Sequence, residues 1–378
     1  MRIPKRIDSK KFDVLIVDDE GSSIIKHCVP SSMSVTVLPI RSVLPWIMSF
    51  KFLFRIVARL LQNKKIGKSI LYAIVDTVNP SVLITYNDNG ISMGKWEQEF
   101  PSKLLIAVQN GVRYEGDHWW KAGHSLPVLY GFGDCERDAI QDKGLSCNEY
   151  NAVGSFKYGV YRATCVEEKR KYDFCFISQF SSFPESYKWL ALLIEAEREC
   201  FSKLVSFCQE NRYSLGIALR HMAKSSYFEE EVENFKSLDK YNLVDFNLDY
   251  HREWSSYEQA SSAEVVVAGT STLAYEMFGA GKKTLFYGVS KKTIVEAGGS
   301  SKRNFEKLPD CVLADSLAHK PLYDKLDTLL KMDQNEYLFT SENARKYYMK
   351  YQKLYPHEIV KKRINDFVEK TGLANEST

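Results

Sequence analysis

The sequence predicts an α/β fold built from two Rossmann-like domains, and three observations support this expectation. The chain has 378 residues, which is more than a single hydrophobic core usually organises. Hydrophobic residues make up 44% and charged residues 26%, the composition of a folded protein. Short apolar runs alternate with helix-length segments, as in βαβ units, and the alternation starts again near the middle of the chain.

The first half of the chain holds six apolar runs that we expect to form strands. The clearest is FDVLIV at 12–17, which stops at an acidic turn. Nearly continuous apolar runs suit strands that are buried on both faces of a parallel sheet. The expected strands cover residues 12–17, 34–38, 81–85, 104–109, 128–131 and 150–153.

The second half repeats this pattern after the charged segment VEEKRKY at 166–172. We expect a long amphipathic helix over 186–211. Apolar residues at helical spacing also predict a helical end over 341–370, with Ser341 as its start. We therefore place one domain at 1–168 and a second at 169–340. The expected strands of the second domain cover residues 173–178, 215–219, 242–245, 265–268 and 284–287.

Composition and charge exclude several classes of protein. The net charge of +3 is small, so we expect no nucleic-acid partner. Eight cysteines without a C-x-x-C pair predict no metal site and reduced thiols, as in a cytoplasmic protein. The first residues do not read as a secretory signal, and no apolar run is long enough to span a bilayer.

One strand–turn–helix unit carries the expected functional site. In AEVVVAGTSTLAYEMFGAGKKT, at 263–284, a buried strand ends at Gly269, which permits a tight turn before a helix. The N–H groups and the dipole of a helix start attract phosphate, and the hydroxyls of Thr270, Ser271 and Thr272 can donate to its oxygens. Glu276, one turn inside the helix, can reach a ribose. The alternative is that the hydroxyls only cap the helix and Glu276 is solvated.

This unit resembles the donor-nucleotide region of GT-B glycosyltransferases, especially those of bacterial surface-polysaccharide biosynthesis (capsule and lipopolysaccharide). The resemblance implies that Ser271 and Thr272 meet the donor phosphate and that Glu276 meets the ribose. It also implies a two-domain GT-B architecture whose C-terminal helix crosses back onto the first domain. The nucleotide sugar is then a substrate, and no cofactor is expected.

Two further strand ends in the second half are candidate donor contacts. The strand at 215–219 ends in Arg220-His221, which resembles an Arg/Lys–x–His–Pro motif of sialyl-, Kdo- and glycerophosphate-type transferases. The sequence departs from that motif, because Met222 replaces the proline and the histidine directly follows the arginine. His221 is therefore either a phosphate contact or an ordinary surface histidine. Ser178 ends the strand at 173–178 and is expected to face the same cleft.

The first domain is expected to supply the catalytic base and to bind the acceptor. Asp18, Asp19 and Glu20 follow the first strand, and a carboxylate there can deprotonate an acceptor hydroxyl. We take Asp19 and Glu20 as the candidates, with His118 in reserve. The alternative is that these acids cap the next helix.

Acceptor contacts are expected where other strands of the first domain end. The segment 109–113, QNGVR, resembles the Q-(H/N)-G turn of surface-polysaccharide transferases. Gly111 permits the turn, and Asn110 and Arg113 can address a sugar or an anion. Asn87 follows the strand at 81–85 and opens toward the same cleft.

A basic segment suggests where the acceptor resides. Between 41 and 68 the chain has seven lysines and arginines, no acid, and many large apolar residues. A helix of this kind can lie in a membrane interface and meet a lipid-linked glycan. It can equally be a core helix with a basic outer face. We expect a cytoplasmic protein, held at the inner face of the cell membrane if the first reading is right.

The sequence thus predicts a glycosyltransferase that moves a sugar from a CMP-, UDP- or GDP-activated donor to a growing cell-surface glycan. The absence of an obvious D-x-D motif favours metal-independent transfer, and a base among residues 18–20 favours inversion. Three alternatives stay open: a CDP-glycerol-type phosphotransferase, a sugar-nucleotide epimerase, and a non-catalytic nucleotide-sugar-binding protein at a membrane.

Overall fold

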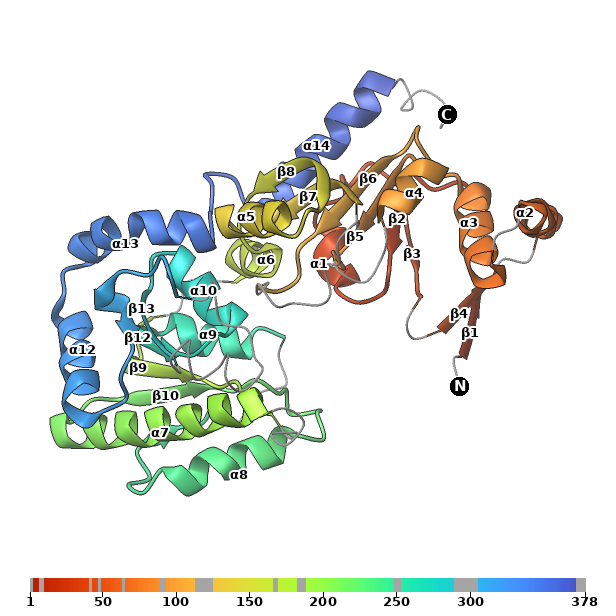
Figure 1. Cartoon of the computed structure of the whole chain (residues 1–378). Coiled ribbons are helices and arrows are strands. Elements are labelled where there is room, and N and C mark those ends of the chain that lie inside the picture. The colour runs from red at the N-terminus through yellow and green to blue at the C-terminus, as the bar shows by residue number, and fades with distance from the viewer. Residues whose placement is uncertain are drawn as a thin grey trace.

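The structure of the protein is a computed structural model, and it describes most of the chain. Within the described residues, two six-stranded parallel sheets form two lobes, and a two-stranded parallel sheet stands apart from both (Figure 1). The two-stranded sheet consists of β1 (Ile3–Arg6) and β4 (Val43–Trp46). The described residues are 3–6, 10–40, 43–46, 49–62, 65–88, 93–112, 125–165, 169–181, 188–247, 253–288 and 305–371.

The sheet of the first domain has the strand order β3-β2-β5-β6-β7-β8. All its strands are parallel. The chain adds β3 on one side of β2 and then returns to add β5 and the later strands on the other side, so the switch point of the sheet lies between β2 and β5. The strands are β2 (Val14–Val17), β3 (Val35–Leu38), β5 (Val82–Thr85), β6 (Leu104–Val108), β7 (Ser125–Gly131) and β8 (Ser146–Ala152).

The two faces of this sheet belong to two separate hydrophobic cores. Along β2, Leu15 and Val17 point into one core while Val14 and Ile16 point into the other, as the two-residue period of a strand requires. The first core is closed by α3 (Ile66–Val78), α4 (Met93–Glu99) and α5 (Asp134–Asp142). The second is closed by α1 (Ser22–Lys26), α6 (Phe156–Thr164) and α14 (Pro356–Thr371).

The sheet of the second domain has the order β11-β10-β9-β12-β13-β14, which is the Rossmann order 3-2-1-4-5-6. Its switch point lies between β9 and β12. The strands are β9 (Tyr172–Ile177), β10 (Leu215–Ala218), β11 (Val244–Asp245), β12 (Ala263–Ala268), β13 (Lys283–Tyr287) and β14 (Leu313–Ala314). The helices are α7 (Lys188–Asn211), α8 (Phe228–Leu238), α9 (Ser255–Ser261), α10 (Thr272–Gly279) and α12 (His319–Lys331).

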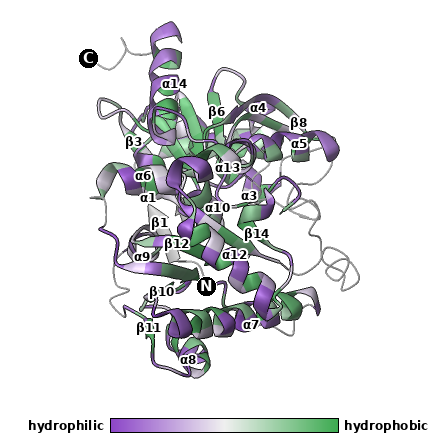
Figure 2. Ribbon diagram, turned by 90° about the vertical axis from the view of Figure 1, so that its left-hand side faces the viewer, coloured by the Kyte–Doolittle hydropathy of each residue, from purple (hydrophilic) through white to green (hydrophobic). Residues whose placement is uncertain are grey.

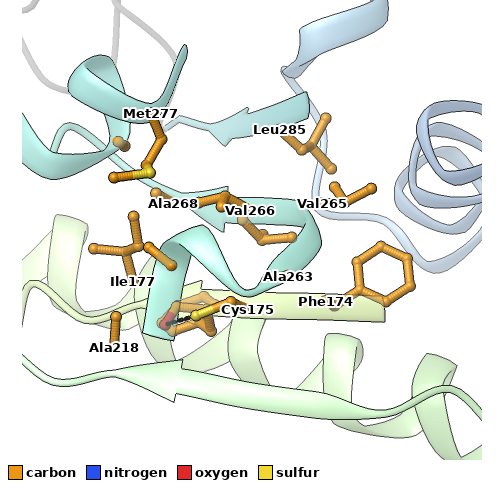
Figure 3. Close-up of a cluster of buried hydrophobic side chains, with 14 of the residues drawn as sticks. Phe174, Cys175, Ile177, Ala218, Ala263, Val265, Val266, Ala268, Met277 and Leu285 are labelled. Atoms are coloured by element: carbon orange, nitrogen blue, oxygen red, sulfur yellow. Dashed lines mark hydrogen bonds between the residues drawn. The ribbon is translucent and has the colours of Figure 1, made fainter. Parts of the chain in front are cut away.

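The centre of the second domain is a dry layer of apolar side chains around β9 and β12. Figure 3 shows Phe174, Ile177, Val265 and Val266 in this cluster, with Met277 of α10 beside the strands. Figure 2 shows the strands of both sheets as largely hydrophobic, whereas outer helices such as α7 and α12 alternate hydrophobic and hydrophilic residues. The buried runs in the sequence therefore form the sheets.

The C-terminal part of the chain crosses from the second domain to the first. α13 (Gln334–Tyr348) packs on α10 of the second domain, and its last turn meets α5 of the first, where Tyr347 donates to Asp138 at 2.9 Å. α14 then packs on the first sheet (Figure 1). The expected start at Ser341 is wrong, because α13 begins seven residues earlier, where Asp333 accepts hydrogen bonds from the N–H groups of Asn335 and Glu336. Ser341 lies inside the helix and donates to the carbonyl oxygen of Tyr337.

The predicted α/β fold of two Rossmann-like domains is confirmed, with small differences at the strand ends. Each expected strand has a counterpart, although the one expected over 242–245 is reduced to Val244–Asp245. β1, β4 and β14 were not predicted; the first two contain prolines, and the third has only two residues. The proposed boundary at 168/169 lies between α6 and β9, partly outside the described residues.

Candidate functional site

The switch point of the second sheet is bridged by Gln179, the second residue after the end of β9. Its Oε1 accepts a 2.7 Å hydrogen bond from the N–H of Thr270, and its Nε2 donates to Thr270 Oγ1 at 3.1 Å. A Cβ on Gly269 would lie 2.3 Å from Gln179 Oε1. Gly269 is therefore needed for this close approach rather than for a left-handed turn.

The start of α10 lies against the first domain. Ser271 is the N-cap residue, but its side chain accepts no capping hydrogen bond, so the alternative reading of Ser271 as a cap does not describe this structure. Thr272 Oγ1 accepts a long hydrogen bond of 3.4 Å from the N–H of Val112, in the turn after β6. The predicted donor helix and the predicted acceptor turn thus come together.

Glu276 lies between the two domains and is 2% exposed. Its carboxylate accepts a hydrogen bond from Ser155, at the start of α6, and another from the hydroxyl of Tyr257 at 2.7 Å. Burial raises the pKa of Glu276 above its usual value, and both hydrogen bonds oppose that rise. A ribose that binds Glu276 must share or replace these partners.

Ser178 and the backbone of Arg220 and His221 converge on one buried carboxylate. Glu231 of α8 accepts hydrogen bonds from the Ser178 hydroxyl, from the N–H of Arg220 at 2.7 Å and from the N–H of His221 at 2.9 Å. Burial raises the pKa of Glu231. This carboxylate therefore holds the carboxyl ends of β9 and β10 at a fixed spacing.

The side chains of Arg220 and His221 occupy different surroundings. Arg220 is exposed and its guanidinium donates to the carbonyl oxygen of Phe180 at 2.9 Å. His221 is half-buried between the rings of Phe180 and Tyr227. Burial, with help from the neighbouring Arg220, lowers the pKa of His221, which favours the neutral imidazole.

The switch point of the first sheet brings together two segments that the sequence predicts for the acceptor side. Asn87, after β5, donates from Nδ2 to Asp18 Oδ2 at 3.1 Å, and both side chains are buried. Asp18 has a positive φ of 89°, which turns the chain sharply after β2. Asp19 is consequently half-buried and Glu20 is exposed at this edge of the sheet.

The turn after β6 is shaped by Gln109. Its Nε2 donates to Glu136 Oε1 at 2.9 Å and to the carbonyl oxygen of Gly111 at 2.8 Å. Its Oε1 accepts from the N–H of Phe132 at 2.9 Å. Asn110 and Gly111 are left half-buried in the turn, whereas Arg113 and His118 lie outside the described residues.

A cavity of about 500 Å³ lies away from these loops, at the opposite, amino-terminal edge of the second sheet. Two of its three lining cations are already engaged: Arg170 pairs with Asp173 and Glu264, and Lys282 donates to two backbone carbonyl oxygens. The open α/β sheets of this class bind ligands at their carboxyl edges. We therefore place the candidate site at the loops and not in this cavity.

Several contacts of the site were not predicted. Gln179 directly follows Ser178 in the loop that the sequence places at the cleft, but its contact with Thr270 was not predicted. The roles of Ser155, Tyr257 and Glu231 could not be predicted. Each forms a hydrogen bond with a residue that is distant in the sequence, and none belongs to a motif. Glu197 of α7 accepts from the N–H of Gln179, and burial raises its pKa to about 8.

Two kinds of feature are absent from the part of the chain that the structure describes. No three His, Cys, Asp or Glu side chains gather there as a metal site would require. Among the helices that the structure describes, none is long and apolar enough to cross a bilayer.

The comparisons with known proteins agree with the fold. A family model described as "putative O-antigen biosynthesis protein" matches residues 106–306, which are 201 of the 378 residues. No curated protein matches the chain. A structure of the wall teichoic acid polymerase TagF is 10% identical with a TM-score of 0.54, and the match covers 96% of this chain and 91% of that one.

A second similar structure is the "putative UDP-N-acetylglucosamine 2-epimerase from Listeria monocytogenes". It is 11% identical with a TM-score of 0.51, and the match covers 97% of this chain and 98% of that one. At such identities the similarity shows the fold, in agreement with the GT-B arrangement of two Rossmann-like domains. The family match extends over more than half of the chain, and the chain therefore belongs to this O-antigen biosynthesis protein family.

Proposed function

We propose that the protein is a glycosyltransferase that moves a sugar from a nucleotide-activated donor onto a growing cell-surface glycan. The contact between Val112 and Thr272 carries this proposal, because it joins the turn after β6 to the start of α10. A donor held at α10 would then lie beside the acceptor segments of the first domain. Membership of an O-antigen biosynthesis family agrees with such a product.

The donor end of the site is the start of α10. Its positive dipole end and its first N–H groups attract the phosphates of the donor, with Ser271 and Thr272 as hydroxyl donors. Gly269 and Thr270 form the turn beneath the phosphates, held by Gln179. Glu276 addresses the ribose once it exchanges Ser155 for the ligand.

Further donor contacts come from the neighbouring strand ends. The exposed guanidinium of Arg220 supplies positive charge for the leaving phosphate, so that transfer needs no metal ion. A neutral His221 can donate a hydrogen bond to a phosphate oxygen. Ser178 contributes through Glu231, which fixes both strand ends.

The acceptor end lies at the carboxyl edge of the first sheet. We assign the base to Glu20 or Asp19, with His118 in reserve, and a single displacement then inverts the anomeric centre. Asn87 positions this edge through Asp18. Asn110, Gly111 and Arg113 are proposed to bind the acceptor.

Turnover of single variants tests this assignment. With a donor identified by calorimetric titration of CMP-, UDP- and GDP-sugars, Glu20→Gln or Asp19→Asn should lower kcat by about a hundredfold or more while donor affinity stays the same. Asp142→Asn, an exposed acid of α5 in the same domain, is the matched control. Full turnover in both loop variants would contradict the base assignment.

Mass analysis of the product separates the alternative activities. Glycosyl transfer adds a sugar to the acceptor, whereas CDP-glycerol-type phosphotransfer adds glycerol phosphate. Epimerisation leaves the acceptor mass unchanged and converts the nucleotide sugar into an isomer of equal mass, which NMR distinguishes. Binding of a nucleotide sugar without turnover would favour a non-catalytic protein.

A further inference from the structure

Helix α2 (Phe50–Leu61) turns its apolar side chains to solvent. Phe50 is 92% exposed, Phe54 75% and Leu61 80%, and Leu53 and Val57 are also exposed. Helical periodicity places these five residues, which we call the apolar stripe, on one face. Single exposed leucines are ordinary on a protein surface, but a contiguous stripe marks an interaction surface.

The opposite face of α2 attaches the helix to its domain through a half-buried arginine, Arg59. Arg59 donates to Asp76 of α3 at 2.7 Å and to Glu99 of α4 at 2.8 Å. Its guanidinium also lies over the rings of Tyr72 and Phe100, at 5.5 and 5.4 Å from their centroids. These directional contacts fix which face of the helix points outward.

A helix that covers a sheet turns its apolar face inward, whereas α2 turns its apolar stripe to solvent and its Arg59 toward the domain. α3 already closes the core over the first sheet, and α2 lies outside α3 at the edge of the domain (Figure 1). Of the large apolar side chains of α2, Phe52 is buried while the stripe stays in water. Exposing these side chains to water is unfavourable, and covering the stripe with another apolar surface would lower the free energy.

The charges around the stripe indicate the chemistry of that surface. The exposed Lys51 lies on α2, and the exposed Lys65 and Lys68 lie at the start of α3 beside the exposed Ile66. The sequence has no aspartate or glutamate between Glu20 and Asp76. The covering surface must therefore combine an apolar layer with negative charge, as the interface of a membrane rich in anionic lipids does.

We propose that α2 lies in the interface of such a membrane, with its apolar stripe among the acyl chains and its cations at the phosphates. The helix runs parallel to the membrane plane and holds the first domain at the inner face of the cell membrane. This proposal goes beyond the proposed activity and does not depend on it. It would bring the acceptor edge of the first sheet within reach of a lipid-linked glycan.

Flotation of the full-length protein with lipid vesicles tests the proposal. We expect the protein to float with vesicles of phosphatidylcholine and phosphatidylglycerol, less with phosphatidylcholine alone, and less again at high salt. Phe50→Ser combined with Phe54→Ser should lower partitioning by about tenfold or more, because the protein loses two aromatic rings that the membrane would bury. Replacing Lys51, Lys65 and Lys68 by glutamine should remove most of the preference for anionic lipid.

The matched control is Phe339→Ser, which makes the same change at a residue of α13 that is 83% exposed. It should float like the unmodified protein, and circular dichroism should show that all variants are folded. Absence of flotation with anionic vesicles, or equal flotation of the double serine variant, would overturn the proposal. So would sedimentation of a dimer that the α2 variants dissociate without any vesicle binding, since the stripe would then be a contact between copies.

Nucleotide-sugar titration without vesicles keeps this test separate from the proposed activity. The α2 variants should bind the donor as well as the unmodified protein does. Loss of vesicle binding alone concerns α2, whereas loss of donor binding in variants of the α10 site concerns the proposed function.

Discussion

Ser155 of the first domain donates a hydrogen bond to the carboxylate of Glu276 in the second, and the two residues are 121 positions apart in the sequence. The contact links the start of α6 to the middle of α10, beside the predicted phosphate turn. Since the Glu276 carboxylate is the group assigned to the ribose, donor binding and the relative position of the domains should be coupled through this bond.

We predict that Glu276→Gln lowers donor affinity by about tenfold, because hydrogen bonds to a charged carboxylate are stronger than those to an amide. Isothermal titration with the preferred nucleotide sugar measures the effect. Glu264→Gln is the control, since Glu264 belongs to the same βα unit but lies at the amino-terminal end of β12. Unchanged affinity in Glu276→Gln would remove Glu276 from the site.

We predict opposite effects for two N-cap serines. Ser155 accepts a capping hydrogen bond from the N–H of Tyr158, so Ser155→Ala should lower the free energy of unfolding by about 1 kcal/mol or more. The side chain of Ser271 makes no cap, so Ser271→Ala should cost less than about 0.5 kcal/mol. Urea unfolding compares the two variants.

Donor titration completes the comparison of the two serines. Ser271→Ala should weaken donor binding several-fold, because a hydroxyl that meets the phosphate is removed. If Ser271→Ala instead loses stability and keeps donor affinity, Ser271 serves the helix and not the ligand.

We predict that stability falls as the pH rises from about 4 to about 8, through Glu197. Burial raises the pKa of Glu197 to about 8 in the folded protein, whereas the pKa of an exposed glutamate is about 4.3. Within this window the folded state keeps a proton that the unfolded state has released. The folded state is therefore favoured at low pH, and this contribution is lost as the pH rises through about 8.

Glu197→Gln tests this assignment, because an amide stays neutral and can still accept from the N–H of Gln179. The variant should be more stable than the unmodified protein at pH near 8 and similar near 4, as followed by urea unfolding. Glu195→Gln, two residues earlier on the exposed face of α7, should show no such difference. Parallel pH profiles of the two variants would disprove the assignment.

We predict that Gly269→Ala destabilises the turn by about 1–3 kcal/mol, because its Cβ would meet Gln179 Oε1. Gln179→Ala alone should also cost stability, since the N–H of Thr270 loses its acceptor. The double variant should be more stable than the sum of the two effects implies, because the clash is absent. Additive losses would show that the close approach does not constrain Gly269.

Prediction from the sequence succeeded where a single local pattern decides the structure. Buried apolar runs such as Val14–Val17 and Ala263–Ala268 leave no other place for the segment than the interior of a parallel sheet. The start of α10 was also located from its sequence, since a glycine and three hydroxyl residues follow a strand.

Prediction failed where residues far apart in the chain decide. The sequence of α2 shows a strong apolar face but not its direction, which Arg59 sets by pairing with Asp76 and Glu99. The sequence pattern placed the start of the C-terminal helical region at Ser341. α13 instead begins after Asp333, whose side chain caps the helix. The partners of Glu276 carry no motif at all.

The crossing of α14 onto the first sheet has a consequence for synthesis on the ribosome. Val360 and Ile364 belong to the same core as Val14 and Ile16, so this core, which α1 and α6 cover in part, stays incomplete until residues 356–371 have emerged. The second domain has all its described strands by residue 314 and can therefore close earlier. Domains usually fold in the order in which they are translated. Here the first domain, although translated first, should complete its folding last.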